Sequence, residues 1–195
     1  MPELSRIEKW FVNKRGEGYF EKLLSRMKES GAVKVGNNSK ILELGAGNGA
    51  LSSLLYEQFH PLSITLTDFD QDQVATARKR MEDRFGRVPD VITIEQADAT
   101  NLRYQNNTFD LVVAHLILHH LGKLENIFTG LGEIHRVLVP DGAFIYVEFA
   151  HKKEIRRRLG ELGFNISYRK GFHRETVIAT KLPSPGNLNH KITMD

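Results

Sequence analysis

Cysteine is absent from this 195-residue chain. Its absence excludes disulfide bonds, thiolate metal sites and catalysis by a cysteine nucleophile. Long apolar runs are missing too, because no segment approaches the roughly 20 apolar residues of a membrane-spanning helix. Residues 1–10 are charged and contain no apolar signal core. We therefore expect a cytoplasmic protein without a membrane partner.

A strong charge of one sign is lacking as well. The net charge is +3, since 27 lysines and arginines accompany 24 aspartates and glutamates. Basic residues gather at 14–15, 78–80, 152–153 and 156–158, but carboxylates lie between them and no stripe of basic and aromatic residues appears. This interleaving is typical of solvated helix faces. Nucleic acid stays open as a partner without support from the pattern.

Predicted strands and helices alternate along the chain, which indicates an α/β fold with a parallel sheet. Apolar, β-branched runs predict strands at 41–44, 62–68, 90–96, 109–115 and 143–148, the last after a turn at 140–142. Helical spacing predicts two helices within 3–30 and further helices at 50–56, 71–85, 124–138 and 152–162. Asp70 is expected to cap the helix at 71–85 in a capping box with Gln73. Segments 164–168 and 176–180 are predicted to form an antiparallel hairpin.

The most informative pattern is a glycine-rich loop, Gly45-Ala46-Gly47-Asn48-Gly49, between a predicted strand and a predicted helix. Glycines allow backbone to approach a ligand closely, and the free N–H groups of the helix N-terminus would face it. The loop also fits the GxGxxG/A fingerprint of dinucleotide-binding folds, with Asp68 as the later acidic residue. A nicotinamide-dependent oxidoreductase is therefore one alternative.

The neighbouring residues favour a different family. The pattern Glu43-Leu44-Gly45-x-Gly47-x-Gly49 resembles motif I of the class I S-adenosylmethionine-dependent methyltransferases. Three further motifs follow in that family's order, at Asp68, at Asp98-Ala99 and at 116–121, so the resemblance covers roughly residues 39–182. It implies a Rossmann-like three-layer sandwich around a mostly parallel seven-stranded sheet, with strand order 3-2-1-4-5-7-6 and strand 7 antiparallel. The predicted terminal hairpin agrees with this plan and opposes the oxidoreductase.

The resemblance implies S-adenosylmethionine as the cofactor and S-adenosylhomocysteine as its product. Glu43 would meet the methionine ammonium, because a carboxylate at a buried strand end needs a partner. Gly45 and His115 would contribute backbone carbonyls to the same group. The glycine-loop residues that complete this part of the expected site are Ala46, Gly47 and Gly49.

The nucleoside half of the cofactor is assigned to later motifs. Asp68 would accept hydrogen bonds from two ribose hydroxyls, since two carboxylate oxygens suit two adjacent donors. Phe69 would pack on the adenine. Asp98 would meet the adenine amino group, and the backbone N–H of Ala99 would meet a ring nitrogen.

Methyl transfer from a sulfonium can rely on positioning and desolvation, so no catalytic residue is strictly required. If the acceptor must lose a proton, the candidate bases are His119 and His115, followed by His120 and Glu148. The set of aspartates and asparagines that would hold magnesium is missing, since Asp110 lies at the start of its predicted strand. No metal site is therefore expected.

A small or medium-sized methyl acceptor is the leading expectation for the substrate. Methylation of RNA or protein and non-catalytic cofactor binding are the alternatives. We expect one domain, with N-terminal helices at 1–38, a core at 39–182 and an irregular tail at 183–195. The N-terminal aromatic residues would either close a lid over the acceptor or pack against the sheet; they are Trp10, Phe11, Tyr19 and Phe20.

Overall fold

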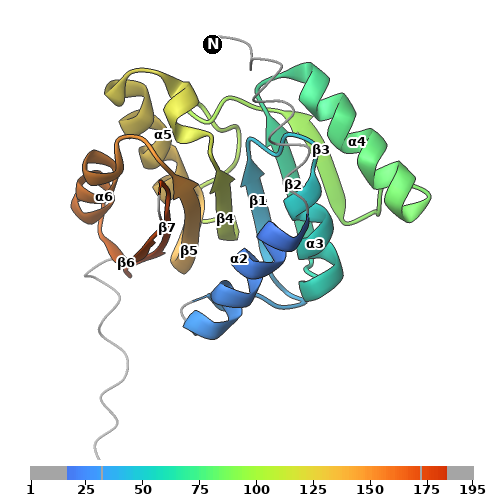
Figure 1. Cartoon of the computed structure of the whole chain (residues 1–195), viewed down its shortest axis with the longest axis horizontal. Helices are drawn as coiled ribbons and strands as arrows, with labels where there is room; N and C mark the ends of the chain where they lie inside the picture. The colour runs from blue at the N-terminus through green and yellow to red at the C-terminus, as the bar shows by residue number, and fades with distance from the viewer. Residues whose placement is uncertain (1–16, 32, 172, 184–195) are drawn as a thin grey trace, which may run out of the picture.

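The computed structural model describes residues 17–31, 33–171 and 173–183, which form a seven-stranded sheet between two layers of helices (Figure 1). The strand order is β3-β2-β1-β4-β5-β7-β6, and β7 pairs antiparallel with both of its neighbours. The predicted topology is therefore confirmed. The strands are β1 Lys40–Leu44, β2 Ser63–Asp68, β3 Ile92–Gln96, β4 Phe109–His115, β5 Leu138–Glu148, β6 Phe164–Lys170 and β7 Glu175–Lys181.

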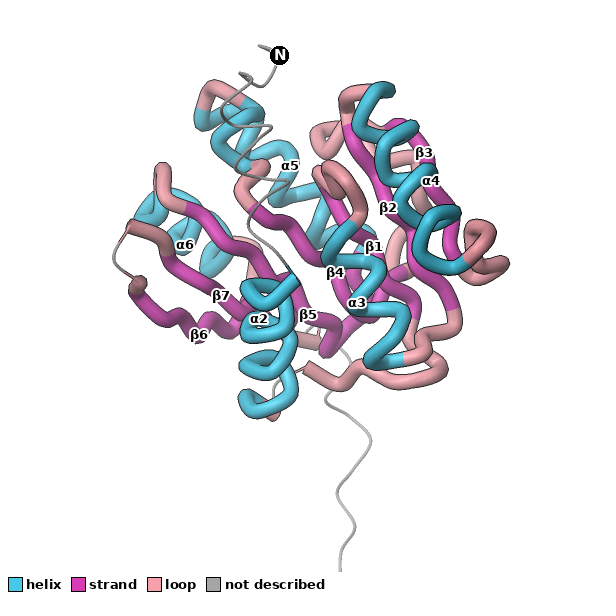
Figure 2. Tube along the Cα trace, turned by 45° about the vertical axis from the view of Figure 1, so that its right-hand side comes forward, coloured by secondary structure: helices cyan, strands magenta, loops and turns pink. Residues whose placement is uncertain are grey.

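Helices cover both faces of the sheet. Three lie on one face (Figure 2), namely α2 Glu17–Ser30, α3 Ala50–Phe59 and α4 Gln71–Phe85. The other face carries α5 Leu124–Val137, α6 Lys152–Glu161 and the short 3₁₀ helix η1 Leu118–Leu121. Central strands must then be apolar on both sides, and Ile41 and Leu42 of β1 accordingly enter opposite core clusters. No helix in the described ranges is long and apolar enough to cross a membrane.

The predicted bounds of α4 are confirmed, but its predicted capping box is wrong. Asp70 caps the helix by accepting a hydrogen bond from the N–H of Asp72 at 2.8 Å. The N–H of Asp70 donates to the carboxylate of Asp68 at 3.0 Å, not to the side chain of Gln73. A carboxylate two residues away reaches this N–H locally, so the end of β2 and the start of α4 are joined directly.

β5 begins earlier than the predicted 143–148, directly after α5 ends. Its pairing with β4 jumps from Phe109 opposite Leu138 to Leu111 opposite Ala143. The predicted turn at 140–142 is thus a bulge inside the strand, with Asp141 at a φ of 62°. Turn-forming residues do bend the chain here, but the strand continues through the bend.

The structure describes only part of the segment for which two N-terminal helices were predicted. Residues 1–16, with Trp10 and Phe11, lie outside the described residues, as do the Tyr19 side chain and the tail residues 184–195. In α2 the apolar face is buried against α3 and the sheet, through Phe20, Leu23, Leu24 and Met27. This helix therefore contributes to the core.

Candidate functional site

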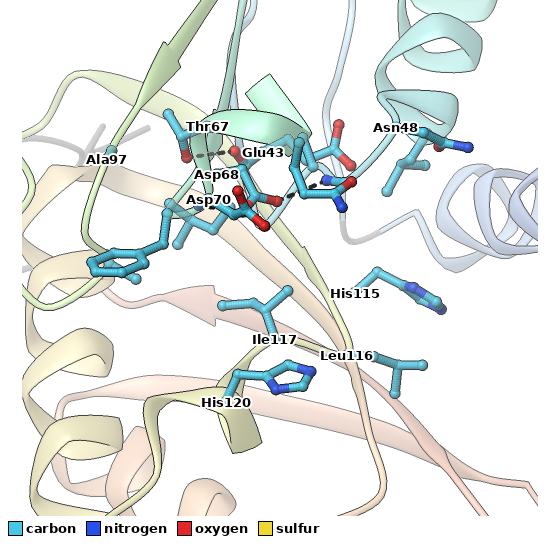
Figure 3. Close-up of a pocket in the computed structure, with 18 of the residues that line it drawn as sticks. Glu43, Asn48, Thr67, Asp68, Asp70, Ala97, His115, Leu116, Ile117 and His120 are labelled. Atoms are coloured by element: carbon cyan, nitrogen blue, oxygen red, sulfur yellow. Dashed lines mark hydrogen bonds between the residues drawn. The ribbon is translucent and has the colours of Figure 1, made fainter. Parts of the chain in front are cut away.

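A pocket of about 400 Å³ opens where the carboxyl ends of β1, β2 and β4 meet. Ligands of open α/β sheets bind at this edge, because the strand order reverses there. Figure 3 shows Asp68 and His120 on opposite sides of the pocket, with Ile117 between them. Eight of the ten predicted cofactor-binding residues line it: Glu43, Gly45, Ala46, Gly47, Asp68, Phe69, Ala99 and His115.

The three loop glycines all have positive φ angles but serve different purposes. A Cβ on Gly45 would overlap the Ile117 side chain, so the loops after β1 and β4 touch only because this position has none. Gly49 does not line the pocket. A Cβ on Gly49 would lie 3.2–3.3 Å from side-chain atoms of Met81, Ala77 and Leu66. Its role is therefore close packing of α3 against α4 and the sheet.

Asp68 at the end of β2 is held by two backbone donors. Its Oδ2 accepts from the N–H of Gly47 at 2.9 Å, and its Oδ1 accepts from the N–H of Asp70 at 3.0 Å. Each oxygen keeps further acceptor capacity. The carboxylate is thus fixed in the pocket wall and can still accept from a pair of ligand hydroxyls.

Glu43 of β1 is a buried acid in the pocket wall, with 3 % of its surface exposed. Its Oε2 accepts a hydrogen bond from the hydroxyl of Ser52 in α3. Burial raises the pKa of Glu43 to about 7, and the charge of Asp68 adds to the rise, while the bond from Ser52 opposes it. A cation entering the pocket would therefore favour ionisation of Glu43 near neutral pH.

The loop after β3 contributes backbone to the pocket, but the Asp98 side chain does not line it. Asp98 Oδ1 accepts from the N–H of Thr100 at 2.8 Å and from its hydroxyl at 2.7 Å. Ala99 lines the pocket, and its N–H makes no hydrogen bond within the described ranges. The structure therefore offers a free donor at Ala99 and a turn-forming side chain at Asp98.

An ion pair on α5 anchors the loop between β3 and β4. Sequence reasoning did not predict this contact. Arg136 donates to the carbonyls of Leu102 at 2.8 Å and Tyr104 at 2.7 Å, while Glu133 accepts from the Leu102 N–H at 2.8 Å. The hydrogen bond from Arg136 holds the pKa of Glu133 below its ordinary value. The only sequence signal was an acid and a base three residues apart on a helix.

The three predicted histidines differ in their relation to the pocket. His115 and His120 line the pocket, and the His115 ring meets Phe20 of α2 edge-on at 5.0 Å. His119 does not line it. Its Nδ1 lies 2.9 Å from Oε1 of Glu148, the last residue of β5.

Glu148 is a fully buried carboxylate with several donors. Besides His119, the N–H groups of Phe149 at 2.8 Å and Ala150 at 3.3 Å donate to its Oε1. Burial acts to raise the pKa of Glu148, but the bonds from His119 and from these N–H groups outweigh burial and hold it below its ordinary value. Glu148 is therefore ionised at neutral pH, and the facing His119 nitrogen carries a proton.

Three aromatic rings lead from the pocket to the surface. The His119 ring lies between those of His120, 4.0 Å away, and Phe149, 4.4 Å away between centroids. His120 lines the pocket, whereas Phe149 is 47 % exposed. His119 thus contacts one ring that lines the pocket and one that is exposed. No cluster of three or more His, Asp or Glu suited to a metal occurs in the part of the chain that the structure describes.

Comparison with known proteins adds independent findings. A family model described as a methyltransferase domain matches residues 42–146. The malonyl-[acyl-carrier protein] O-methyltransferase of Geobacter sulfurreducens is 33 % identical over 111 residues, which are 57 % of this chain and 39 % of that protein. The demethylmenaquinone methyltransferase of Thermus thermophilus is 31 % identical over 110 residues, 56 % of this chain and 47 % of that protein. The chain thus spans less than half the length of these two relatives.

Other comparisons extend over more of the chain. A phosphatidylethanolamine N-methyltransferase of Cereibacter sphaeroides is 30 % identical over 145 residues, which are 72 % of this chain and 68 % of that protein. Among solved structures, a SAM-dependent methyltransferase from Aquifex aeolicus has a TM-score of 0.68 at 15 % identity, covering 84 % of this chain and 89 % of that one. At that identity the likeness concerns the fold.

Proposed function

The chain belongs to the class I S-adenosylmethionine-dependent methyltransferase family, and we propose that it transfers a methyl group from this cofactor to a small-molecule acceptor. The names of its relatives support a small acceptor group, since they refer to a malonyl group on an acyl-carrier protein, a demethylmenaquinone and a phosphatidylethanolamine. The carrying observation is the fixed Asp68 carboxylate in a pocket closed by the contact of Gly45 with Ile117.

The described residues fit this cofactor. Asp68 has acceptor capacity for the two ribose hydroxyls, and the Ala99 N–H is a free donor for an adenine nitrogen. Glu43 is a buried acid whose ionisation a ligand ammonium would favour. Asp98 is assigned no contact, because its side chain does not line the pocket and Thr100 donates to its Oδ1.

When bound, the cofactor supplies an activated methyl group on a sulfonium. The chain would position this group through Asp68 and the glycine loop, and the Gly45–Ile117 contact would keep water from one side. His119 would accept the acceptor's proton. Ionised Glu148 places the ring proton on Nδ1, which leaves the lone pair on Nε2 as the base.

The position of His119 indicates where the acceptor would bind. Because the His119 ring contacts both His120, which lines the pocket, and the exposed Phe149, we expect the acceptor to contact the surface formed by His119 and Phe149. His115 packs edge-on against Phe20 and lines the pocket itself, so we assign it to the cofactor. Phe20 brings α2 to the same pocket, which supports a covering role for this helix.

The proposal is tested first by calorimetric titration with S-adenosylmethionine, S-adenosylhomocysteine and NAD. We expect the two adenosyl ligands to bind and NAD not to bind. Asp68→Ala should weaken adenosyl binding by about tenfold or more, because two hydrogen-bonded hydroxyls lose their acceptor. Asp83→Ala is the matched control, since Asp83 is an exposed acid on α4 that pairs with Lys79.

Formation of S-adenosylhomocysteine is then measured with a malonyl carboxylate, a demethylmenaquinone and a phosphatidylethanolamine as acceptors. Turnover with one of these classes would establish transfer to a small molecule. RNA-dependent turnover would favour a macromolecular acceptor instead. Tight cofactor binding without turnover on any acceptor would indicate a non-catalytic binding protein, and binding of NAD alone would contradict the cofactor.

A further inference from the structure

A second buried carboxylate stands beside Glu148. Glu175 is the first residue of β7, and it is directly opposite Glu148 in the antiparallel pairing of β5 with β7. The two residues are 0 % and 2 % exposed. Directly opposed side chains have Cβ atoms about 5 Å apart, and like charges there destabilise the pair. Both carboxylates therefore need compensation to remain ionised.

The compensation comes from two different elements. Glu148 is stabilised by His119 and by backbone N–H groups. Glu175 is stabilised by Arg156 of α6, whose Nη1 donates to Oε2. The Arg156 guanidinium also lies 4.3 Å from the ring centroid of Tyr168 in β6. Arg156 thus connects α6 to the hairpin formed by β6 and β7.

Unpaired polar atoms lie in the same region. Tyr146 is two residues before Glu148 on β5, so both side chains point to the α6 face of the sheet. Its buried hydroxyl and Oε1 of Glu175 make no hydrogen bond in the described ranges. Burial raises the pKa of Tyr146, the charges of Glu175 and Glu148 add to the rise, and Arg156 opposes it. The charges of Glu175, Arg156 and Glu148 thus all act on the buried hydroxyl of Tyr146. The Glu148–His119 and Glu175–Arg156 pairs therefore share one buried region.

We propose that Arg156 is a positioning residue for His119: by neutralising Glu175, it allows Glu148 to remain ionised and to hold the His119 ring proton on Nδ1. The effect of Arg156 on catalysis rests on the proposed function, in which His119 accepts a proton. The electrostatic link between the two pairs does not rest on that function. It can be measured without cofactor or acceptor.

Loss of the Arg156 charge has a defined consequence. Glu175 and Glu148 would then be adjacent buried carboxylates without the Arg156 cation, and such pairs share a proton. A proton on Glu148 would turn one of its oxygens into a donor. The carboxylate would no longer select the Nδ1–H tautomer of His119. Removing the charges of Arg156 and Glu175 together leaves Glu148 with only its own partners.

The experiment compares Arg156→Met, Glu175→Gln and the double variant with wild type by NMR. Carboxyl ¹³C shifts give the pKa of Glu148, and two-bond ¹H–¹⁵N spectra give the His119 tautomer. Arg156→Met should raise the pKa of Glu148 by about 3 or more, toward neutral pH, and should therefore mix the two tautomers. The double variant should keep a low pKa and the Nδ1–H tautomer. Arg157→Met is the matched control, because Arg157 is an exposed neighbour paired with Glu161.

Two results would overturn the proposal. One is a folded Arg156→Met variant with the wild-type Glu148 titration and tautomer. The other is a double variant that behaves like Arg156→Met. If Arg156→Met does not fold, Glu175→Gln decides, since it should lower the pKa of Glu148, and an unchanged value would refute the link. Cofactor titration is a separate experiment, so failure of the proposed function and failure of this link are distinguishable.

Discussion

A Cβ atom placed on Gly45 would come within 2.9 Å of the Cβ of Ile117 and closer still to its Cγ2. Gly45 follows β1 and begins the glycine loop, and Ile117 follows β4, so 72 positions in the chain separate two residues that close one wall of the pocket. The wall therefore depends on the absence of a side chain at one position and on the shape of another.

Gly45→Ala should weaken binding of S-adenosylhomocysteine by about tenfold or more and lower stability. The new methyl group meets Ile117, and the φ of 66° adds strain of about 1 kcal/mol. Calorimetry and thermal unfolding measure the two effects. Gly160→Ala is the control, because it is helical with nothing within 4 Å, and it should be neutral or slightly stabilising. Normal binding by Gly45→Ala would show that the two loops separate without cost.

Glu43 should make stability depend on pH. Burial raises its pKa from about 4.5 to about 7, so between these values the folded protein holds a proton that the unfolded chain has released. The free energy of unfolding should therefore fall as the pH rises through this window. The free energy of unfolding of the Glu43→Gln variant should fall less over the same window. Urea unfolding at several pH values measures the difference, and parallel curves for the two proteins would contradict the expectation.

Glu43 should also release a proton when the cofactor binds. If the ligand ammonium favours ionised Glu43, titration with S-adenosylmethionine below about pH 7 should release a proton. The observed enthalpy should then vary with the ionisation enthalpy of the buffer. Glu43→Gln should abolish this variation. A buffer-independent enthalpy in wild type would mean that the ammonium binds elsewhere.

Glu148→Gln should slow methyl transfer about 10²-fold to 10⁴-fold on an acceptor that must lose a proton. The amide keeps the shape of Glu148, but it does not stabilise a protonated His119 ring. Affinity for S-adenosylhomocysteine should be unchanged, since neither residue lines the pocket. Glu154→Gln, a nearby acid in the first turn of α6, is the control. Full activity of Glu148→Gln would leave methyl transfer to positioning alone.

Lys181→Met should destabilise the fold by about 2–3 kcal/mol without affecting cofactor affinity. Lys181 ends β7 at the edge opposite Glu175, and its buried Nζ donates to Leu138 O at 2.6 Å, His135 O at 2.9 Å and Asn107 Oδ1 at 3.0 Å. Methionine fills the space but leaves these oxygens unpaired. Urea unfolding measures the loss, with exposed Lys79→Met as control.

Local patterns predicted most of the fold. The α4 bounds and the β4 bounds follow from periodicity within a single segment, and the order of the sheet follows from a motif series that recurs in one family. The bulge at 139–142 was not predictable, because a proline, an aspartate and a glycine predict a bend but not whether the strand resumes its pairing. That outcome depends on β4, which lies far away in the sequence.

Contacts that residue types do not specify, one local and two long-range, explain where the site departs from the expectation. Asp98 stood at the expected position, but Thr100 two residues later captures its carboxylate. Gly49 belonged to the motif, yet its neighbours come from β2 and α4 and lie behind the loop. The approach of His119 to Glu148 joins residues 29 positions apart and depends on how β4 and β5 pair. Residue types alone identified these side chains without assigning their partners.

The reversed direction of β7 has a consequence for how this edge of the molecule responds to change. In β1, β2 and β4 the last residues of each strand reach the pocket, whereas β7 delivers its first residue, Glu175, to the same edge. The short connection between β6 and β7 therefore sets the position of Glu175 directly. Insertions or deletions in that connection should alter the surroundings of Glu148 and His119 while the cofactor pocket, built on other strands, keeps its shape. Preference for the acceptor could thus diversify without loss of the methyl donor.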